Sequence, residues 1–536
     1  MTSTDPSEPR RGLFRRFLDL VEWLGNLLPH PVTLFAVICV AIVLISGLAG
    51  YFEVQVEDPR PEGAKGRAAD GMVRAISLIN AEGFRRMAME LVTNFTSFAP
   101  LGTVLVALLG VGVAERTGLL GAGIRAMVLG APRSLLTSVV VFAAVVSNTA
   151  SEMGYVVLIP LAAAVFHSVG RHPLAGLSAA FAGVSGGYSA NILIGTVDPL
   201  LSGITTEAAS LIDTAYLPGG AKEVLPTANY YFMAISTVLI TVVGTLVTTR
   251  IVEPKLGPYD PSRGEEGIEE STNNMGALSP EEKKGLTWAM VTIAVLGAGL
   301  VVLCLPGGWF RIPLEDATLV QELRPMLKSV VALIFVVFII PSIVYGAITG
   351  SIKNDRDVID GMAKAMSSMG LYMVLVFFAA QFVAYFNWTN LGIICAVTGA
   401  DLLEQWNLTS PVVFIPFILM CCFVNLMLGS ASAQWAVTAP IFVPMLMTVG
   451  YSPEVIQAAY RIGDSTTNII TPMMSYFGLI LAFALRYEKK LGIGTLVAMM
   501  IPYSICFLLG WIVLFYSWVF LLGLPVGPDA PTYYGQ

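Results

Sequence analysis

Ser147-Asn148-Thr149-Ala150-Ser151-Glu152 is a polar stretch inside hydrophobic sequence, and Gly186-Gly187-Tyr188-Ser189-Ala190-Asn191-Ile192 is a second one further along. The other half of the chain repeats this arrangement with Gly429-Ser430-Ala431-Ser432-Ala433-Gln434 and then Gly463-Asp464-Ser465-Thr466-Thr467-Asn468-Ile469. Polar side chains at bilayer depth cost free energy unless they have partners. The two matching sets therefore predict one shared site inside a membrane protein.

The composition indicates a polytopic membrane protein. Of 536 residues, 55% are hydrophobic and 12% are charged, and the mean hydropathy is +0.74. A pI near 5.2 and the lack of a basic stripe argue against a nucleic-acid partner. The six cysteines lie mostly in apolar runs without metal-binding spacing, so we expect small core residues and no cofactor.

Nine hydrophobic runs are long enough to cross a membrane, at about 31–51, 97–115, 174–200, 228–249, 287–305, 327–346, 366–386, 457–485 and 493–523. Two further stretches, 134–166 and 410–448, are hydrophobic but broken by the polar residues. Non-helical backbone at that depth is tolerated only where protein or a water cavity surrounds it. The sequence thus predicts an all-α polytopic protein of nine transmembrane helices plus two re-entrant helical hairpins.

The basic residues orient this topology. Lys and Arg gather in the segments that are cytoplasmic if the N-terminus is inside, and the tail after Lys490 has none. The N-terminus is therefore expected in the cytoplasm and the C-terminus in the periplasm. Counting the hairpins as full spans would place Arg171 outside and the acidic 203–223 loop inside, which the positive-inside rule disfavours.

The polar stretches also predict an internal repeat. Repeat 1 covers 1–252, a linker with the extra span 287–305 covers 253–325, repeat 2 covers 326–525, and a periplasmic tail covers 526–536. The extra helix makes the number of crossings between corresponding elements odd, so the repeats should have inverted topology. Inverted repeats with broken helices are the organisation of secondary transporters.

Two alignments relate the halves. Matching Asn191 with Asn468 pairs Gly186 with Gly463, whereas matching Ser151 with Ser432 places Gly429 opposite Asn148. The second alignment suggests unequal halves, with Asn148 in the better ion site. Chance similarity between stretches rich in Gly and Ser is the alternative.

The side chains at the breaks suit a coupling ion. Sodium needs oxygen ligands, which hydroxyls, amides and freed carbonyls supply, while exposed helix N-termini attract anions. A proton is the alternative coupling ion, and helix–helix hydrogen bonding is the alternative for any single residue. The candidate sodium ligands are Asn148, Thr149, Ser151, Ser189, Asn191, Ser430, Thr467 and Asn468.

Three charged residues and one tryptophan are candidates for substrate or coupling contacts. Asp198 is either such a contact or a helix-end residue near the interface. Arg461 and Asp464 share a helix face, so they form either a local ion pair or a site in which Arg461 tunes Asp464. Trp435 either stacks on an aromatic substrate or anchors its helix at the interface.

The chain resembles the p-aminobenzoyl-glutamate transporter (AbgT) family. The resemblance rests on Asn94-Phe95-Thr96-Ser97-Phe98-Ala99-Pro100-Leu101-Gly102, Gly110-Val111-Gly112-Val113-Ala114-Glu115, Phe377-Phe378-Ala379-Ala380-Gln381-Phe382, Phe386-Asn387-Trp388-Thr389-Asn390-Leu391-Gly392 and Arg461-Ile462-Gly463-Asp464-Ser465. It implies a homodimer in the lipid of the bacterial inner membrane. It also implies that the functional positions are Asp198, Ser432, Trp435, Pro453, Arg461, Asp464 and Pro472.

The expected function is ion-coupled export of sulfonamide antimetabolites and p-aminobenzoic acid derivatives. The alternative is sodium-coupled import of p-aminobenzoyl-glutamate or a dicarboxylate. An enzyme is disfavoured, because the histidines are only His30, His167 and His172 and no hydrolase motif occurs. A channel would lack saturable transport coupled to a gradient.

Overall fold

The computed structural model describes residues 30–60, 67–150, 154–216, 222–260, 263–264, 277–314 and 318–535. Nearly all regular structure in these ranges is helical. The one sheet found there is an antiparallel hairpin of β1 (Gln55–Glu57) and β2 (Met72–Arg74). The predicted all-helical membrane class is confirmed. Ser151 and most of the polar linker lie outside the described residues.

Eight described helices are long and apolar enough to cross a membrane: Pro31–Tyr51, Ala81–Thr117, Tyr230–Leu256, Pro280–Cys304, Val330–Thr349, Gly370–Trp388, Pro411–Leu428 and Ile493–Leu521. Pro411–Leu428 lies in the predicted hairpin 410–448, and the others overlap predicted spans. The predicted spans 174–200 and 457–485 are absent from this set, because each is interrupted by non-helical backbone.

The helices of the first half are α2 (Pro31–Tyr51), α3 (Ala81–Thr96), α4 (Ala99–Thr117), α5 (Leu119–Leu129), α6 (Leu136–Ser147), α7 (Ile159–Ser168), α8 (Pro173–Phe181), α9 (Val197–Ala209), α10 (Tyr230–Val247) and α11 (Glu253–Leu256). A 3-10 turn at Asn148–Ala150 ends α6, and a π-helical turn at Gly154–Leu158 precedes α7. Another π-helical turn, Ala182–Gly186, follows α8. The chain is then non-helical up to α9.

The helices of the second half are α13 (Pro280–Cys304), α14 (Leu319–Glu322), α15 (Arg324–Lys328), α16 (Val330–Thr349), α17 (Asp355–Ser368), α18 (Gly370–Trp388), α19 (Leu391–Gln405), α20 (Phe414–Leu428), α21 (Ala431–Thr448), α22 (Pro453–Thr467), α23 (Phe477–Tyr487) and α24 (Ile493–Phe515). The α20–α21 connection turns at Gly429, whose φ is +58°. A Cβ there would lie 2.9 Å from the Met473 carbonyl oxygen, so glycine lets this tip approach the break between α22 and α23.

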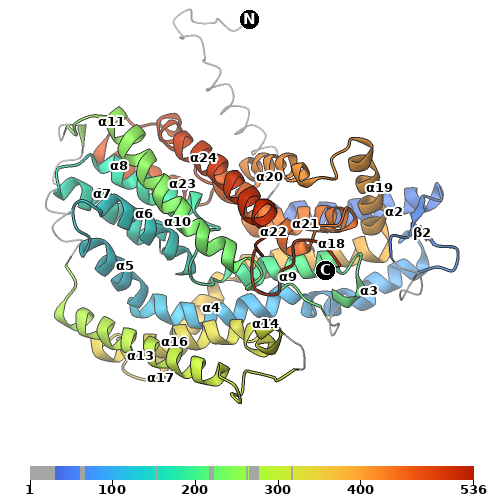
Figure 1. Cartoon of the computed structure of the whole chain (residues 1–536), viewed down its shortest axis with the longest axis horizontal. Coiled ribbons are helices and arrows are strands. Elements are labelled where there is room, and N and C mark those ends of the chain that lie inside the picture. The colour runs from blue at the N-terminus through green and yellow to red at the C-terminus, as the bar shows by residue number, and fades with distance from the viewer. Residues whose placement is uncertain are drawn as a thin grey trace, which may run out of the picture.

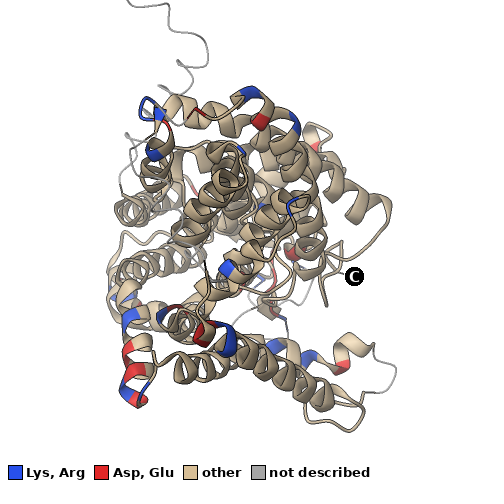
Figure 2. Cartoon of the chain, turned by 90° about the vertical axis from the view of Figure 1, so that its left-hand side faces the viewer, with Lys and Arg blue, Asp and Glu red and all other residues tan. Residues whose placement is uncertain are grey.

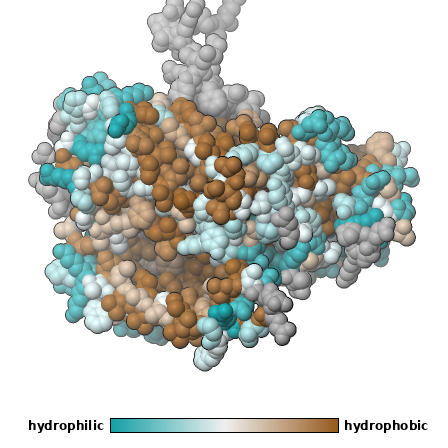
Figure 3. Space-filling view, viewed as in Figure 1, coloured by the Kyte–Doolittle hydropathy of each residue, from teal (hydrophilic) through white to brown (hydrophobic). Residues whose placement is uncertain are grey.

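The helices form a large core body and a smaller layer beside it (Figure 1). The layer consists of α4, α16, α13 and α17, in which α16 packs against both α4 and α13. In the body, α22 packs against α20, α24 and α9, so that elements of both halves meet around it. Figure 3 shows apolar residues across the middle of the molecule and polar ones mostly towards its two ends. In Figure 2, most helix surfaces likewise carry no charged residue, as a bilayer requires.

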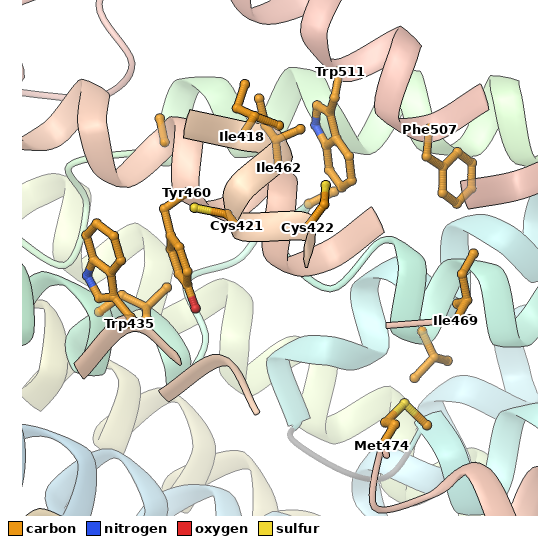
Figure 4. Packing of buried hydrophobic residues seen from close by; sticks show 14 of the residues in the cluster. Ile418, Cys421, Cys422, Trp435, Tyr460, Ile462, Ile469, Met474, Phe507 and Trp511 are labelled. Atoms are coloured by element: carbon orange, nitrogen blue, oxygen red, sulfur yellow. The ribbon is translucent and has the colours of Figure 1, made fainter. Parts of the chain in front are cut away.

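The hydrophobic core is continuous through the body and reaches the polar site. Trp435 and Tyr460 stack with ring centroids 4.2 Å apart, and both side chains are fully buried (Figure 4). Cys421 and Cys422 of α20 are also buried in this core, and Cys39 is buried elsewhere, as expected for small apolar residues, whereas Cys304 and Cys506 are half-buried and Cys395 is exposed. The core therefore holds α20, α21 and α22 in a fixed relation around the second polar set.

Candidate functional site

Asn148 and Asn425 make the same contact in the two halves. The Asn148 Nδ2 atom donates to the Gly187 carbonyl at 3.4 Å, and the Asn425 Nδ2 atom donates to the Asp464 carbonyl at 2.6 Å. Donor and acceptor are 39 residues apart in both cases. Both asparagines are buried, and the Oδ1 atom of each has no hydrogen-bond partner among the described residues.

This equivalence corrects one of the two sequence alignments. Matching Asn191 with Asn468 also matches Asn148 with Asn425, and the contacts agree with it. The contacts do not support placing Gly429 opposite Asn148, because Asn425 makes the contact that corresponds to that of Asn148. The second half therefore has its own buried amide at the first hairpin arm, which the sequence interpretation missed. An isolated Asn within the apolar run of α20 was the available signal.

The candidate ion ligands of the first half lie close together. Asn191 Nδ2 donates to Thr149 Oγ1 at 2.8 Å, which joins the break to the hairpin tip. The Ser189 N–H donates to Ser465 Oγ at 3.0 Å, which joins the first half to the second. The Ser189 hydroxyl is buried without a partner in the part of the chain that is described. Ser151 falls outside that part.

The candidates of the second half divide into two places. Asn425 Nδ2 also lies 3.0 Å from Thr467 Oγ1 and 2.8 Å from Asn468 Oδ1, so these three residues form one cluster. Ser430 instead lies at the hairpin tip, 3.4 Å from Ser432 through their hydroxyls. Among the described residues no group of three His, Cys, Asp or Glu side chains could hold a metal ion. The cluster of Asn425, Thr467 and Asn468 offers amide and hydroxyl oxygens to a cation.

A buried ion pair joins the halves beside these clusters. Arg461 of α22 donates to an Asp198 carboxylate oxygen at 2.7 Å, and both side chains are almost fully buried. The other Asp198 oxygen accepts from the Gly195 N–H at 2.7 Å. Asp198 therefore lies at the start of α9, buried and paired rather than exposed. The local pair between Arg461 and Asp464 that spacing allowed does not form.

A chain of hydrogen bonds extends from this pair to Trp435. Asn229 Oδ1 accepts from Arg461 Nε at 3.0 Å and from Gln457 Nε2 at 2.7 Å. Gln457 Oε1 accepts from Thr205 Oγ1, which itself accepts from Trp435 Nε1 at 2.9 Å. Sequence reasoning missed Asn229, Gln457 and Thr205, because their roles depend on which helices pack together.

Asp464 has no such partners. It is fully buried, and neither carboxylate oxygen has a hydrogen-bond partner within the described ranges. The hydroxyl of the nearby Tyr460 donates to the Ala431 carbonyl at 2.6 Å, and a phenol has only one proton to donate. A buried carboxyl without a donor or cation is costly when charged. Asp464 is therefore suited to bind a proton or a cation.

A cavity of about 320 Å³, the central pocket, lies between the hairpin tips and the breaks. Its lining includes Asn148, Asn468, Ser430 and Ser432, so both halves contribute. Four tyrosines also line it: Tyr155, Tyr188, Tyr372 and Tyr476. None of its described lining residues carries a formal charge. Tyr155 and Tyr476 stack with centroids 4.6 Å apart.

Trp435, by contrast, does not line the central pocket. Its ring stacks on Tyr460 and its N–H donates to Thr205, so in this conformation the ring is buried and does not face the pocket. Pro453 begins α22 at the opposite end from the breaks, and Pro472 lies in the break between α22 and α23. Neither lines the central pocket.

A helix N-terminus adds partial positive charge to the central pocket. Ser430 is the N-cap residue of α21, and its side chain makes no capping hydrogen bond. Ser430, Ala431 and Ser432 all line the cavity, so the first turn of α21 faces it. An N-terminus of this kind attracts an oxygen anion or a strongly polar oxygen.

The apolar helices, the broken polar spans and the pocket between them define a polytopic membrane transport protein. The profile of the AbgT transporter family matches residues 16–534, and the chain belongs to this family. The p-aminobenzoyl-glutamate transport protein of Escherichia coli K12 is 35% identical over 528 residues, which cover 98% of each protein.

Two solved structures are similar over nearly their whole length. MtrF of Neisseria gonorrhoeae, described as one of a class of antimetabolite efflux pumps, is 56% identical with a TM-score of 0.88. That match covers 96% of this chain and 100% of MtrF. The YdaH transporter of Alcanivorax borkumensis is 42% identical with a TM-score of 0.84, covering 93% of this chain and 100% of YdaH.

Proposed function

We propose that this AbgT-family transporter is an ion-coupled exporter of sulfonamide antimetabolites and p-aminobenzoic acid derivatives. The similarity to MtrF, an antimetabolite efflux pump, supports the direction. The name of the E. coli relative supports the p-aminobenzoyl class of substrate.

The composition of the central pocket is the observation that carries this proposal. Tyrosine rings and uncharged polar groups suit a flat aromatic solute with little net charge. The N-terminus of α21 provides N–H groups for a sulfonyl or carboxylate oxygen at one end of that solute. A p-aminobenzoate ring with one such polar end fits both features.

The alternative is sodium-coupled import of p-aminobenzoyl-glutamate or a dicarboxylate. A dicarboxylate needs cationic partners for two charges, and no described residue lining the central pocket is Lys or Arg. The buried Arg461 is already paired with Asp198. The pocket therefore favours the aromatic solute over the dicarboxylate.

The coupling ion in this proposal is a sodium ion or a proton. The oxygen atoms around Asn148 and Asn425 would bind sodium, while the Asp464 carboxyl would bind either ion. The matched contacts of the two asparagines support two repeats of inverted topology that meet at one pocket. We further propose a homodimer in the bacterial inner membrane, with the N-terminus inside.

Efflux from cells tests the proposal. Cells that express the protein are loaded with a radiolabelled sulfonamide and then energised, and the retained label is compared with cells that carry an empty vector. We expect faster loss of label with the wild-type protein and vector-like loss with Asp464→Asn, which keeps the side-chain volume. Equal loss in all three would contradict export.

A further inference from the structure

A second and larger cavity, the tail pocket, lies beside the C-terminal tail. Its volume is about 670 Å³, within the range of small-molecule sites. The tail, the loop before α10, the α14–α15 segment and the first turn of α22 enclose it. The residues that matter here are Tyr216, Lys222, Arg324, Glu454, Asp529 and Tyr534.

The wall formed by the tail is held by specific bonds. Tyr451 and Tyr533 form an antiparallel bridge, and the Tyr534 N–H donates to the Gly450 carbonyl at 2.8 Å. The Ser452 N–H donates to the Thr532 carbonyl at 3.2 Å. The tail is therefore fixed against the start of α22, and the tail pocket is a built cavity.

Glu454 supplies an acceptor without a donor. Its side chain is 5% exposed, it lines the tail pocket, and its Oε2 atom has no hydrogen-bond partner among the described residues. A buried carboxylate in that state needs an N–H donor, a cation or a proton. A ligand with an amine would provide that donor.

Positive charge lies elsewhere in the same cavity. Lys222 Nζ lies 3.2 Å from Asp213 and lies over the rings of Tyr216 and Tyr534. Burial would raise the pKa of Asp213, but its bonds from the Ala215 N–H and Lys222 hold that pKa below its usual value. Arg324 adds a guanidinium 3.9 Å from Asp529. The carboxylate end of an aromatic ligand would share Lys222 with Asp213 and Arg324 with Asp529.

We infer that the tail pocket is a second solute-binding site, which takes an aromatic compound with an amine at one end and a carboxylate at the other. The inference rests on the proposed function, which supplies the class of solute. The amine faces Glu454, the ring lies among the tyrosines, and the carboxylate faces Lys222 and Arg324. No residue of the tail pocket also lines the central pocket, so the two sites are separate.

Hydrogen bonds nevertheless link the tail pocket to the buried ion pair of Arg461 and Asp198. The Glu454 carbonyl accepts from Asn229 Nδ2 at 2.8 Å, and Asn229 Oδ1 accepts from Arg461. Glu454 and Asn229 thus connect a solute in the tail pocket to Arg461, the partner of Asp198. The tail pocket is therefore placed to bind a solute at one end of the transport route.

Equilibrium dialysis of radiolabelled p-aminobenzoate against the purified full-length protein tests the inference. We expect two bound molecules per chain. Glu454→Gln and Arg324→Gln should each weaken one of them by about tenfold or more, equivalent to ~1.4 kcal/mol. Glu282→Gln is the matched control, because the Glu282 carboxylate is paired with Arg125 at 2.5 Å and lines neither pocket, and it should leave both molecules bound.

Variants of the central pocket separate this inference from the proposed function. Tyr476→Ala should weaken only the molecule that Glu454→Gln leaves bound. A single bound molecule that is lost with Tyr476→Ala and kept with both tail-pocket variants would overturn the second site and leave the proposed function standing. No binding to the wild-type protein would overturn the solute class, and the second site with it.

Discussion

Arg461 and Asp198 form an ion pair of 2.7 Å between residues 263 positions apart in the chain. The pair fastens α22 of the second half to the start of α9 in the first half. Because both side chains are buried, each charge depends on the other for its stability. Movement of one half against the other must therefore carry this pair along or break it.

Asp198→Asn should leave the Arg461 charge buried without a counter-charge. Removing one partner of a buried pair typically costs ~3–5 kcal/mol. We expect a marked fall in the temperature of unfolding in detergent, measured by fluorescence-detected size exclusion, together with loss of efflux. The double variant Asp198→Asn/Arg461→Gln should recover part of the thermal stability but not the efflux. Equal stability of the single variant and the wild type would contradict the role of the pair.

Trp435→Ala should abolish sulfonamide resistance in expressing cells. The variant removes a fully buried ring that stacks on Tyr460, at a cost of about 3–5 kcal/mol. Trp435→Phe keeps a ring on Tyr460 and loses only the bond to Thr205, about 1 kcal/mol. We therefore expect Trp435→Phe to retain part of the resistance. Full resistance with Trp435→Ala at normal expression would show that Trp435 is not required at the site.

Tyr476→Ala should weaken binding of an aromatic substrate in the central pocket. The Tyr155–Tyr476 stack forms part of the wall, and an aromatic contact is worth about 0.5–1.5 kcal/mol beyond its area. The dissociation constant should rise by about tenfold with little change in thermal stability. Tyr51→Ala is the control, because Tyr51 is exposed at the end of α2. Equal affinity of Tyr476→Ala and Tyr51→Ala would contradict this position for the ring.

Asn148→Ala and Asn425→Ala should have similar effects, since the two residues make equivalent contacts. Each removes a buried oxygen that is suited to a cation, so the ion concentration for half-maximal transport should rise by about tenfold. Asn94→Ala is the control, because the Asn94 amide contacts Gln381 on α18. An effect of Asn148→Ala alone would instead support the unequal halves suggested by the alignment of Ser151 with Ser432.

Much of the fold could be predicted from the sequence. Hydrophobic length located most of the long helices, and the polar breaks located the interruptions near Asn191 and Asn468. The β-hairpin of β1 and β2 was missed, because strands of three residues carry too little periodicity. The short helices α5, α17 and α19 were also missed, since a membrane-length window does not resolve them.

The site was only partly predictable. Asp198, Arg461 and Asp464 were recognised because charge inside an apolar chain is costly. The partners of these residues could not be predicted from the sequence. Whether Arg461 pairs with Asp198 or with Asp464 depends on how α9 packs against α22. Asn425 was missed because a single amide within α20 shows its contact to Asp464 only after folding.

Ion-driven accumulation in proteoliposomes tests the central claim of coupled export most directly. Radiolabelled p-aminobenzoate or a sulfonamide is supplied outside, with sodium or protons concentrated either inside or outside the vesicles. Exchange of ion for solute drives accumulation whichever way the protein is inserted, provided that the ion is concentrated inside. We expect accumulation in that arrangement and its loss with an ionophore. Accumulation only with the ion concentrated outside would show symport and contradict export.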